Sequence, residues 1–343
     1  MSNEQLTALV ASDALRPRLQ FHELAGDHVT FDRLTGSESY ETTVVRSVEA
    51  GTVTCVAGPR GAGKTSLIAH CCAHLPEALV ALRVPVIGMN DPGDPGVVAA
   101  TMITAALQAG EFEAYQRDLL EAARADEITT RRGRPTARAK LGGGVIPVEL
   151  QGELESFGRD YRRDASALDR LQGLDRLVTM FVARDVRPVF VIEDTEAMAG
   201  SPESDETVTR FFARSLHMLA RELDAPTLIA VQDEFLTNEA YVELRGGMRE
   251  VAIPLLDEPA RAIETIVEHR VTERAGVQAS VSDILDTAAL DAFGAFYTET
   301  GGSLRHTLAA MAASVEHAAE VGAGQVGERE ARYGITQWRT RRP

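Results

Sequence analysis

A glycine-rich stretch near the start of the chain reads Gly58-Pro59-Arg60-Gly61-Ala62-Gly63-Lys64-Thr65, and Ser66 follows it. Its spacing is typical of the loop with which nucleotide triphosphatases bind phosphate. The glycines let backbone N–H groups surround a polyphosphate, the lysine reaches the β- and γ-phosphates, and the hydroxyl after it ligates Mg²⁺. We therefore expect residues 58–66 to bind ATP, with Lys64 on the phosphates and Thr65 on Mg²⁺.

The residues on either side of this loop favour the same interpretation. Thr52–Ala57 is a β-branched, apolar run that predicts a buried parallel strand, and apolar residues recur at helical spacing after the loop. The phosphates would then lie at the N-terminus of a helix, where unpaired amides and the helix dipole favour anions. A chance glycine-rich turn would lack this strand and helix.

Composition and charge limit the class of protein. The 343 residues predict two domains, and no apolar stretch is long enough to span a membrane. The N-terminus has no basic segment followed by an apolar one, and three cysteines are too few for a disulfide framework, so we expect a cytoplasmic protein. His70 and His74 flank Cys71 and Cys72, which could suggest zinc, but the cysteines continue an apolar helix stripe and fit the core better.

The formal net charge of −16 argues against a surface that generally coats nucleic acid. Basic residues nevertheless cluster in a run from Arg131 to Lys140 and in the tail, at Arg339, Arg341 and Arg342. Such runs are commonly solvated loops, but these two are also where nucleic acid or an acidic partner could bind. Alternatively, residues 333–340 form a short strand or clip that docks on a protein partner, with Trp338 as its anchor.

A second candidate motif, which is acidic, lies downstream of the phosphate loop. There the apolar run Pro188–Ile192 leads into Glu193 and Asp194. Acidic residues at the carboxyl edge of a buried strand can face a metal and an attacking water, as the other half of a nucleotide triphosphatase site does. We expect both carboxylates to bind Mg²⁺ and to take part in hydrolysis. The alternative is the first turn of a helix that Asp194 or Thr195 caps.

Further apolar runs predict the rest of a sheet, and apolar stripes predict the helices between and after its strands. Strands that alternate with helices form a parallel sheet with helices on both faces. The predicted fold class is therefore α/β: a P-loop NTPase with a parallel sheet flanked by helices, plus a small all-helical lid domain. The strands are expected at residues 52–57, 78–87, 188–192, 226–231 and 251–256, and the apolar stripes of the lid at 263–271 and 304–318.

Four segments follow from this pattern. The predicted segments are an N-terminal leader (1–50), a P-loop ATPase domain (51–256), the helical lid (257–322) and a basic tail (323–343). An insertion at about 129–158 interrupts the ATPase domain; it carries the basic run and three consecutive glycines. Its alternation through Val148, Leu150 and Leu154 predicts an exposed hairpin.

Taken in order, these signals resemble the AAA+ ATPases, in particular the initiator and origin-recognition clade and the related transposon-regulator and STAND-like bacterial ATPases. Residues 34–41 are similar to the L-x-G-R-E-x-E motif with which that clade begins, with Ser37 in place of its arginine. Gln232 corresponds to the polar sensor residue at the end of the fourth strand. Residues 302–308 resemble the G-D-x-R-x-x-L lid motif, so Arg305 would contact the γ-phosphate. The resemblance covers residues 30–320 and implies an oligomeric ATPase.

The chain departs from the clade in two respects. The clade's strand ends in Asp then Glu, whereas here Glu193 precedes Asp194. Asp194 has a shorter side chain than the Glu that the clade has at this position, so it would place the catalytic base differently. This difference favours slow ATP turnover or a switch held by bound nucleotide. Initiators also carry a DNA-binding winged helix after the lid, for which the remaining residues are too few, so DNA initiation does not transfer by analogy. The resemblance suggests Arg245 as the arginine that a neighbouring subunit supplies, with Arg249 in reserve; either could instead form a surface ion pair.

Two functions remain open from the sequence. The first is an ATP-hydrolysing AAA+ switch that forms homo-oligomers and acts on a second protein or on nucleic acid. The second is a non-catalytic nucleotide-binding regulatory subunit of a bacterial anti-phage defence or mobile-element system. A small-molecule kinase comes third, because the sensor and lid pattern disfavours it.

Overall fold

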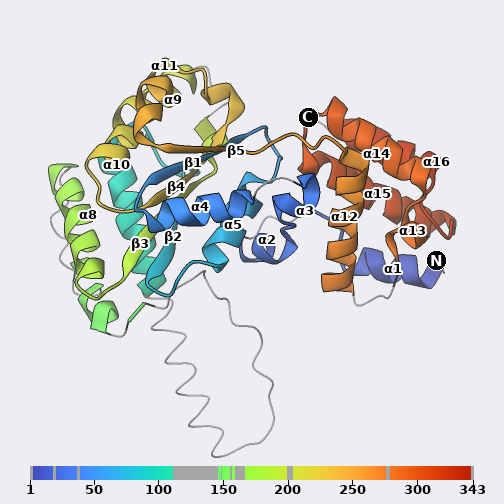
Figure 1. Ribbon diagram of the computed structural model, residues 1–343, viewed down its shortest axis with the longest axis horizontal. Coiled ribbons are helices and arrows are strands. Elements are labelled where there is room, and N and C mark those ends of the chain that lie inside the picture. Colours follow the sequence, from blue (N-terminus) through green and yellow to red (C-terminus); the bar gives the residue numbers. More distant parts are fainter. Residues whose placement is uncertain are drawn as a thin grey trace, which may run out of the picture. The chain divides into compact units, whose positions relative to one another are not determined.

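The chain forms two compact units in a computed structural model (Figure 1). The helical unit comprises Met1–Glu41, Gly58–His70 and Ala252–Pro343, and the sheet unit comprises Thr42–Ala57 and Cys71–Val251. The phosphate loop thus belongs to the helical unit. The structure describes residues 3–17, 21–36, 39–110, 146–147, 149–154, 157–158, 167–198, 204–275 and 279–340.

The sheet unit is built on a five-stranded parallel sheet with the strand order β2-β3-β4-β1-β5. Its central strands are buried almost throughout, as expected of parallel strands that helices cover on both faces. The strands are β1 (Val53–Gly58), β2 (Leu79–Pro85), β3 (Arg187–Glu193), β4 (Thr227–Gln232) and β5 (Arg249–Ala252).

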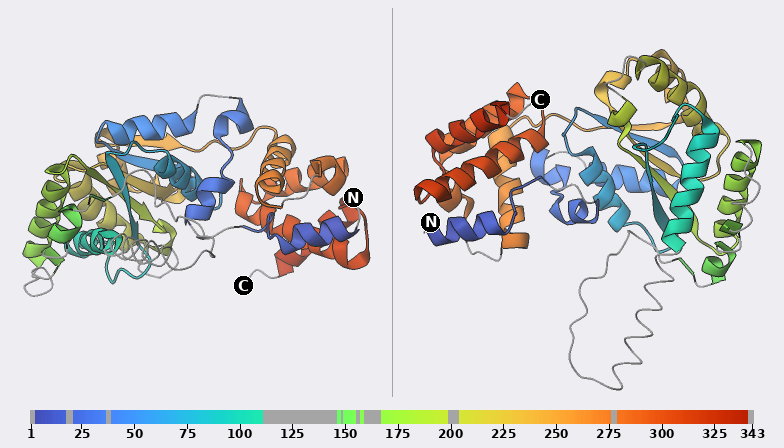
Figure 2. Two further views of the ribbon diagram at one scale, coloured as in Figure 1. Left: turned by 90° about the horizontal axis from the view of Figure 1, so that it is seen from below. Right: turned by 180° about the vertical axis from the view of Figure 1, so that it is seen from behind.

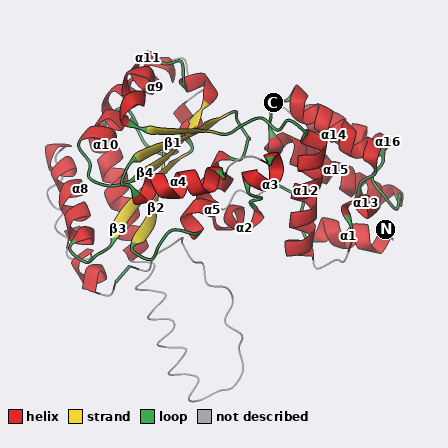
Figure 3. Cartoon of the chain, viewed as in Figure 1, coloured by secondary structure: helices red, strands yellow, loops and turns green. Residues whose placement is uncertain are grey.

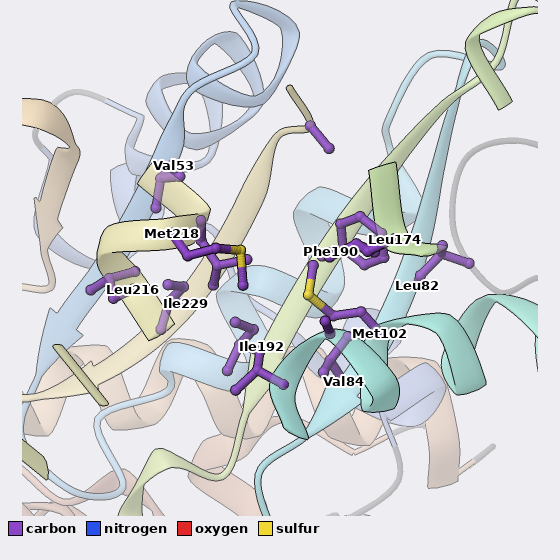
Figure 4. Close-up of a cluster of buried hydrophobic side chains, with 14 of the residues drawn as sticks. Val53, Leu82, Val84, Met102, Leu174, Phe190, Ile192, Leu216, Met218 and Ile229 are labelled. Atoms are coloured by element: carbon purple, nitrogen blue, oxygen red, sulfur yellow. The ribbon is translucent and has the colours of Figure 1, made fainter. Parts of the chain in front are cut away.

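Both faces of this sheet pack against helices (Figure 2). In β3, Phe190 and Ile192 point into one core, which Figure 4 shows, while the alternate residues Val189 and Val191 are buried on the opposite face. A helix at residues 95–110 covers the first face. The other helices of the sheet unit are α4 (Tyr40–Glu49), which begins in the helical unit, α8 (Ala167–Val182), α9 (Ser204–Arg210), the π-helix η2 (Phe211–Leu216), α10 (His217–Arg221) and α11 (Glu239–Leu244).

The helical unit has its own apolar core, and Figure 3 draws its segments α12 to α16 as helices joined by loops. Apolar residues at helical spacing on α12 (Ile263, Val267) and α15 (Met311, Val315) form this core, as the sequence predicts. The helices are α1 (Asn3–Ala11), α2 (Phe21–Asp27), α3 (Phe31–Thr35), α12 (Pro259–Arg270), the π-helical turn η5 (Val271–Ala275), α13 (Val281–Ile284), α14 (Thr287–Glu299), α15 (Leu304–Val321) and α16 (Glu328–Thr340).

The N-terminal segment is part of this helical core. Helix α1 packs on α15, and the Arg16 guanidinium lies 2.6 Å from the carboxylate of Glu316, 300 positions away. Asp27 is buried and pairs with Arg270, at 3.7 Å, and with Arg274. These ion pairs tie the N-terminal segment to α15, to α12 and to the turn that follows α12.

Three structural predictions from the sequence need correction. The hairpin predicted through Leu150 and Leu154 is wrong, because residues 149–154 are helical and both leucines are buried together with Ile146. The four-residue spacing of these three side chains is the helical period. The fifth strand ends at Ala252 rather than at residue 256, since Pro254 has no N–H to continue a sheet. Residues 333–340 are helical rather than a strand.

Within the residues that the structure describes, no helix is both long and apolar enough to cross a membrane. The basic run at residues 131–140, the three glycines 142–144 and Val148 lie outside the described residues, as do Ser37, Glu38, Arg341 and Arg342.

Candidate functional site

The phosphate loop connects β1 to α5 (Lys64–Ala73), as the sequence predicts. Gly61 and Gly63 have φ angles of 82° and 103°, in the left-handed region that favours glycine. A Cβ on Gly63 would have no heavy atom within 4 Å, whereas one on Gly61 would lie 2.3 Å from the Ser303 hydroxyl oxygen. The loop therefore has open space at Gly63 and a close contact with Ser303, just before α15, at Gly61.

Lys64 begins α5, and its ammonium group is held over the loop. Its Nζ donates to the carbonyl oxygens of Gly58 and Pro59, at 2.7 and 2.8 Å. Thr65 and Ser66 add hydroxyls in the first helical turn, and the exposed Arg60 lies on the loop before Ala62. One ammonium group, two hydroxyls and helix N-terminal amides fit a polyphosphate with Mg²⁺, because each is a donor to phosphate or a hard oxygen ligand.

The lid motif contacts this loop within the helical unit. The backbone N–H of Arg305 donates to the Gly61 carbonyl at 3.2 Å, while its side chain is exposed. Ser303 caps α15 by accepting from the N–H of His306. The helix that carries the predicted γ-phosphate arginine therefore begins at the loop itself.

Glu193 ends β3 and is held by an arginine from β2. The register pairs Arg83 with Val191, two positions before Glu193 and on the same face, and the Arg83 Nε lies 2.6 Å from the Glu193 Oε2. Among the described residues the buried Glu193 Oε1 has no hydrogen-bond partner. Burial raises the pKa of Glu193 to about 7, with smaller upward contributions from Asp194 and Glu196, although Arg83 opposes the shift.

The turn after Glu193 is fixed against β4. Asp194 has a φ of 59°, a strained value for a residue with a side chain. The Thr195 hydroxyl donates to the Ala230 carbonyl at 2.5 Å. The buried Gln232 donates through its amide Nε2 to the Glu196 carboxylate at 3.3 Å. The structure thus brings Gln232 together with Glu196, a third carboxylate.

Sequence reasoning missed Arg83 and Glu196. Arg83 could have been found as the one charged residue within the apolar run at 78–87. Glu196 had a weaker signal, because an acid three residues after a strand is equally typical of a helix N-terminus.

Arg245 belongs to the sheet unit and is paired within the chain. Its guanidinium is 2.6 Å from the Glu250 carboxylate, which also accepts from the buried Tyr241 hydroxyl at 2.7 Å. The Arg245 side chain remains 60% exposed, and Arg249 is exposed as well. The role of Arg245 toward a neighbouring subunit stays a prediction.

The motif at residues 34–41 ends in a structural carboxylate. Glu41 accepts from the Phe31 N–H at 3.0 Å, and its Oε1 lies 2.7 Å from the Nε2 of His28. Burial alone would raise the pKa of Glu41, but hydrogen bonds from His28 and the backbone outweigh it and hold the pKa below its usual value. This carboxylate fixes the chain between α2 and α4.

The remaining candidates lie in packed positions. Cys71 and Cys72 are fully buried, as predicted for core residues, and the described residues contain no group of three or more His, Cys, Asp or Glu side chains that could hold a metal ion. Trp338 packs edge-on against Phe296, with ring centroids 5.1 Å apart, and Arg339 pairs with Glu299. Trp338 is therefore an anchor of α16 on the lid.

Solved structures share this fold. No protein-family model matches the chain, and no curated protein is significantly similar to it. The structure of the Aeropyrum pernix ORC1 protein in complex with DNA matches with a TM-score of 0.52 and 15% identity, over 95% of this chain and 69% of that one. The ADPNP-ADP complexes of the Aeropyrum pernix ORC2 protein match with a TM-score of 0.50 and 15% identity, over 88% and 67%.

The chain shares the fold of these two ORC structures. It is a P-loop NTPase fold with a parallel sheet between helices and a helical domain, as the sequence predicts. These structures do not support the transposon-regulator and STAND-like alternatives. Because the sequence identity is so low, the likeness establishes the fold alone.

Proposed function

We propose that the protein is an ATP-binding AAA+ switch that hydrolyses ATP slowly and acts, as a homo-oligomer, on a protein or nucleic-acid partner. The observation that carries this proposal is the hydrogen bond from the Arg305 N–H to the Gly61 carbonyl. A lid helix that begins on the phosphate loop would be displaced or tightened when nucleotide binds there. Such differential contact is what lets a ligand shift a conformational equilibrium.

The residues of the loop and the lid would bind the nucleotide. Lys64 would exchange its carbonyl contacts for the β- and γ-phosphates, and Arg305 would contact the γ-phosphate. Thr65, Glu193 and Asp194 would hold Mg²⁺, directly or through water. Bound Mg²⁺ would supply positive charge against the charge that develops on the phosphates.

Hydrolysis would then be an in-line displacement. The oxygen of water forms a bond to the γ-phosphorus, the bond from that phosphorus to the bridging oxygen breaks, and the electron pair stays on ADP. Glu193 or Asp194 would orient the water and accept its proton, with Gln232 beside it. The Arg83 contact holds Glu193 to one side, so this arrangement favours slow turnover.

The contact between Arg83 and Glu193 also favours a second function. If Arg83 keeps Glu193 from the water, the protein would bind ATP without turnover and act as a regulatory subunit, for example in a bacterial anti-phage defence or mobile-element system. Multiple-turnover phosphate release supports the ATPase, whereas tight nucleotide binding without release supports the regulatory subunit.

Lys64→Ala tests the nucleotide site. Removing the ammonium group should weaken ATP binding about ten- to a hundredfold, because a charge-assisted contact to phosphate is lost. Equilibrium ATP binding and phosphate release measure the effect, and an unchanged unfolding midpoint shows that the variant is folded. If Lys64→Ala left both the ATP affinity and the rate of ATP hydrolysis unchanged, the assignment of this loop as the ATP-binding site would be wrong.

Oligomerisation and the partner need separate tests. Subunits with Lys64→Ala mixed with subunits with Arg245→Ala should regain some activity if Arg245 completes a neighbour's site, because each pairing restores one intact site. Nucleic acid, if it binds, would contact the run at residues 131–140 and the tail at 339–342. DNA binding titrated at two salt concentrations, with each region neutralised in turn, measures this contact.

A further inference from the structure

The turn between α14 and α15 determines where the lid helix α15 begins. Gly301 and Gly302 have φ angles of 67° and 86°, in the left-handed region, and the Gly302 N–H donates to the Tyr297 carbonyl at 2.9 Å. Ser303 follows as the N-cap of α15. The turn, α15 and the phosphate loop all belong to the helical unit, so their contacts lie within one compact body.

Two side chains pack against Gly302. A Cβ on Gly302 would lie 2.3 Å from the Leu255 Cδ2 and 3.3 Å from the Tyr297 hydroxyl oxygen, so glycine lets both side chains approach the turn. The buried Tyr297 hydroxyl in turn accepts a hydrogen bond from the backbone N–H of Leu256, at 3.2 Å. One phenol group therefore joins the segment before α12 to the turn before α15.

The first residues of α15 contact the phosphate loop. A Cβ on Gly61 would lie 2.3 Å from the Ser303 hydroxyl oxygen and 3.1 Å from the Arg305 Cβ, and the Arg305 N–H donates to the Gly61 carbonyl at 3.2 Å. Arg305 is three residues after Gly302, in the first turn of the helix. A shift of the glycine turn would therefore move the base of the Arg305 side chain relative to the loop.

We propose that Tyr297 is a positioning residue that holds the start of α15 on the phosphate loop, so that Arg305 reaches the γ-phosphate of ATP. This inference rests on the proposed nucleotide site and adds to it the residue that places the arginine. ADP has no γ-phosphate, so a correctly placed Arg305 favours ATP over ADP. Tyr297 acts only through Arg305 and does not itself touch the nucleotide.

Tyr297→Phe is the primary variant, because it removes the hydroxyl and keeps the buried ring. The readout is the affinity for ADPNP, an ATP analogue that resists hydrolysis, divided by the affinity for ADP, each measured with Mg²⁺. Loss of the hydrogen bond should lower this ratio about three- to tenfold, and Arg305→Met should lower it about ten- to a hundredfold. The matched control is Tyr333→Phe, which removes the hydroxyl of an exposed tyrosine on α16 in the same unit and should leave the ratio unchanged.

The decisive measurement combines Tyr297→Phe with Arg305→Met. If Tyr297 acts through the arginine, the double variant should have the same ratio as Arg305→Met alone. A tyrosine that merely stabilised the helical unit would change the two affinities together and leave their ratio unchanged.

Unfolding midpoints show which variants are folded. If Tyr297→Phe does not fold, Leu255→Ala takes its place in both measurements, because the Leu255 side chain packs on Gly302 and is nevertheless 58% exposed. The ratio should then fall about two- to threefold, since less apolar contact is lost than at a buried site.

The outcomes separate this inference from the proposed function. An unchanged ratio in the folded variant, or losses that multiply in the double variant, overturns the role of Tyr297 and leaves the nucleotide site standing. An unchanged ratio in Arg305→Met overturns the contact with the γ-phosphate and this inference with it. If the unmodified protein binds neither nucleotide, the proposed function is wrong as well.

Discussion

At the scale of single residues, Glu193 has the environment with the largest consequence for chemistry. Its carboxylate is buried at the end of β3, and Arg83 is its charged partner. Burial dominates the raised pKa, so the ionised form depends on the arginine. Any movement of Arg83 would therefore change how readily Glu193 can bind a metal or accept a proton.

Arg83→Met should reduce the free energy of unfolding by about 1–3 kcal/mol at pH 7.5, because it leaves a buried carboxylate without its charged partner. Solvent weakens the pair relative to a fully buried one, because the Arg83 side chain is 41% exposed. Urea unfolding measures the loss. Arg184→Met is the matched control, since Arg184 pairs with Glu153 where both side chains are about 40% exposed. Equal losses in the two variants would contradict the special role of Arg83.

Glu41→Gln should lower the free energy of unfolding near pH 7, and this loss should shrink in acid. The folded pKa of Glu41 lies below its unfolded value, so the carboxylate stabilises the protein above the unfolded pKa and loses this contribution as pH falls through the folded one. The difference in unfolding free energy between the unmodified protein and the variant should therefore be largest near pH 7 and should shrink in acid. A difference that stays constant between pH 7 and pH 3 would show that Glu41 acts through packing alone.

The sequence predicted the residues of the candidate site whose chemistry depends on a local pattern. Gly61, Gly63 and Lys64 follow from spacing within one loop, and the structure gives both glycines the backbone angles for which the pattern selects. Arg83 and Glu196 could not be predicted in the same way. Each acquires its partner from another strand, so its role depends on register and on a docked turn.

At the scale of elements, α15 and α16 pack unusually closely. A Cβ on Gly334 of α16 would lie 2.2 Å from the Ala310 carbonyl oxygen and 2.1 Å from the Ser314 hydroxyl oxygen of α15. Glycine is required at that crossing because the two backbones approach so nearly. Trp338, one helical turn further on, packs against α14 and α15 through Phe296 and His306.

Gly334→Ala should destabilise the helical unit by about 1–3 kcal/mol, because a methyl group cannot enter the crossing without moving a helix backbone. Thermal unfolding measures the change. Gly152→Ala is the control, since residue 152 lies in a helix with no heavy atom within 4 Å of the added methyl, and should be neutral or stabilising by up to about 1 kcal/mol. A neutral Gly334→Ala would mean that α16 can shift on α15.

Element types were predictable where periodicity was long and regular. The helices α12 and α15 could be predicted because four or five apolar positions in each segment repeat at the helical period. The segment around Leu150 was ambiguous, since apolar residues at 146, 150 and 154 share the helical period while 148, 150 and 154 also fit alternation. Burial in the sheet-unit core settled the ambiguity in favour of helix.

At the scale of the whole molecule, the helical unit is assembled from three separate segments of the sequence, the last of which begins at Ala252. The sequence predicted a leader at residues 1–50, and no local pattern shows that α1 packs on α15 or that Asp27 pairs with Arg270. Contacts between distant segments leave no periodic signal. Comparison with solved structures was needed to show that the chain shares the fold of the Aeropyrum pernix ORC proteins.

Asp27→Asn should destabilise the helical unit by about 3 kcal/mol or more, because it removes the buried carboxylate that pairs with Arg270 and Arg274. Denaturant unfolding measures the change. Asp13→Asn is the control, since Asp13 pairs with Arg16 at an exposed site and asparagine tolerates its left-handed backbone. If the two variants lose similar stability, the Asp27 pairs contribute no more than surface ion pairs.

The pairing of α1 with α15 also has a consequence for synthesis on the ribosome. Arg16 is made 300 residues before its partner Glu316, which corresponds to roughly 15–60 s at ordinary translation rates. During that interval Leu6 and Leu9, which are buried in the finished protein, have no α15 to cover them. The sheet unit, complete once Val251 has emerged, can fold earlier. The nascent first helix is therefore the segment that we expect a chaperone such as a ribosome-bound holdase to shield.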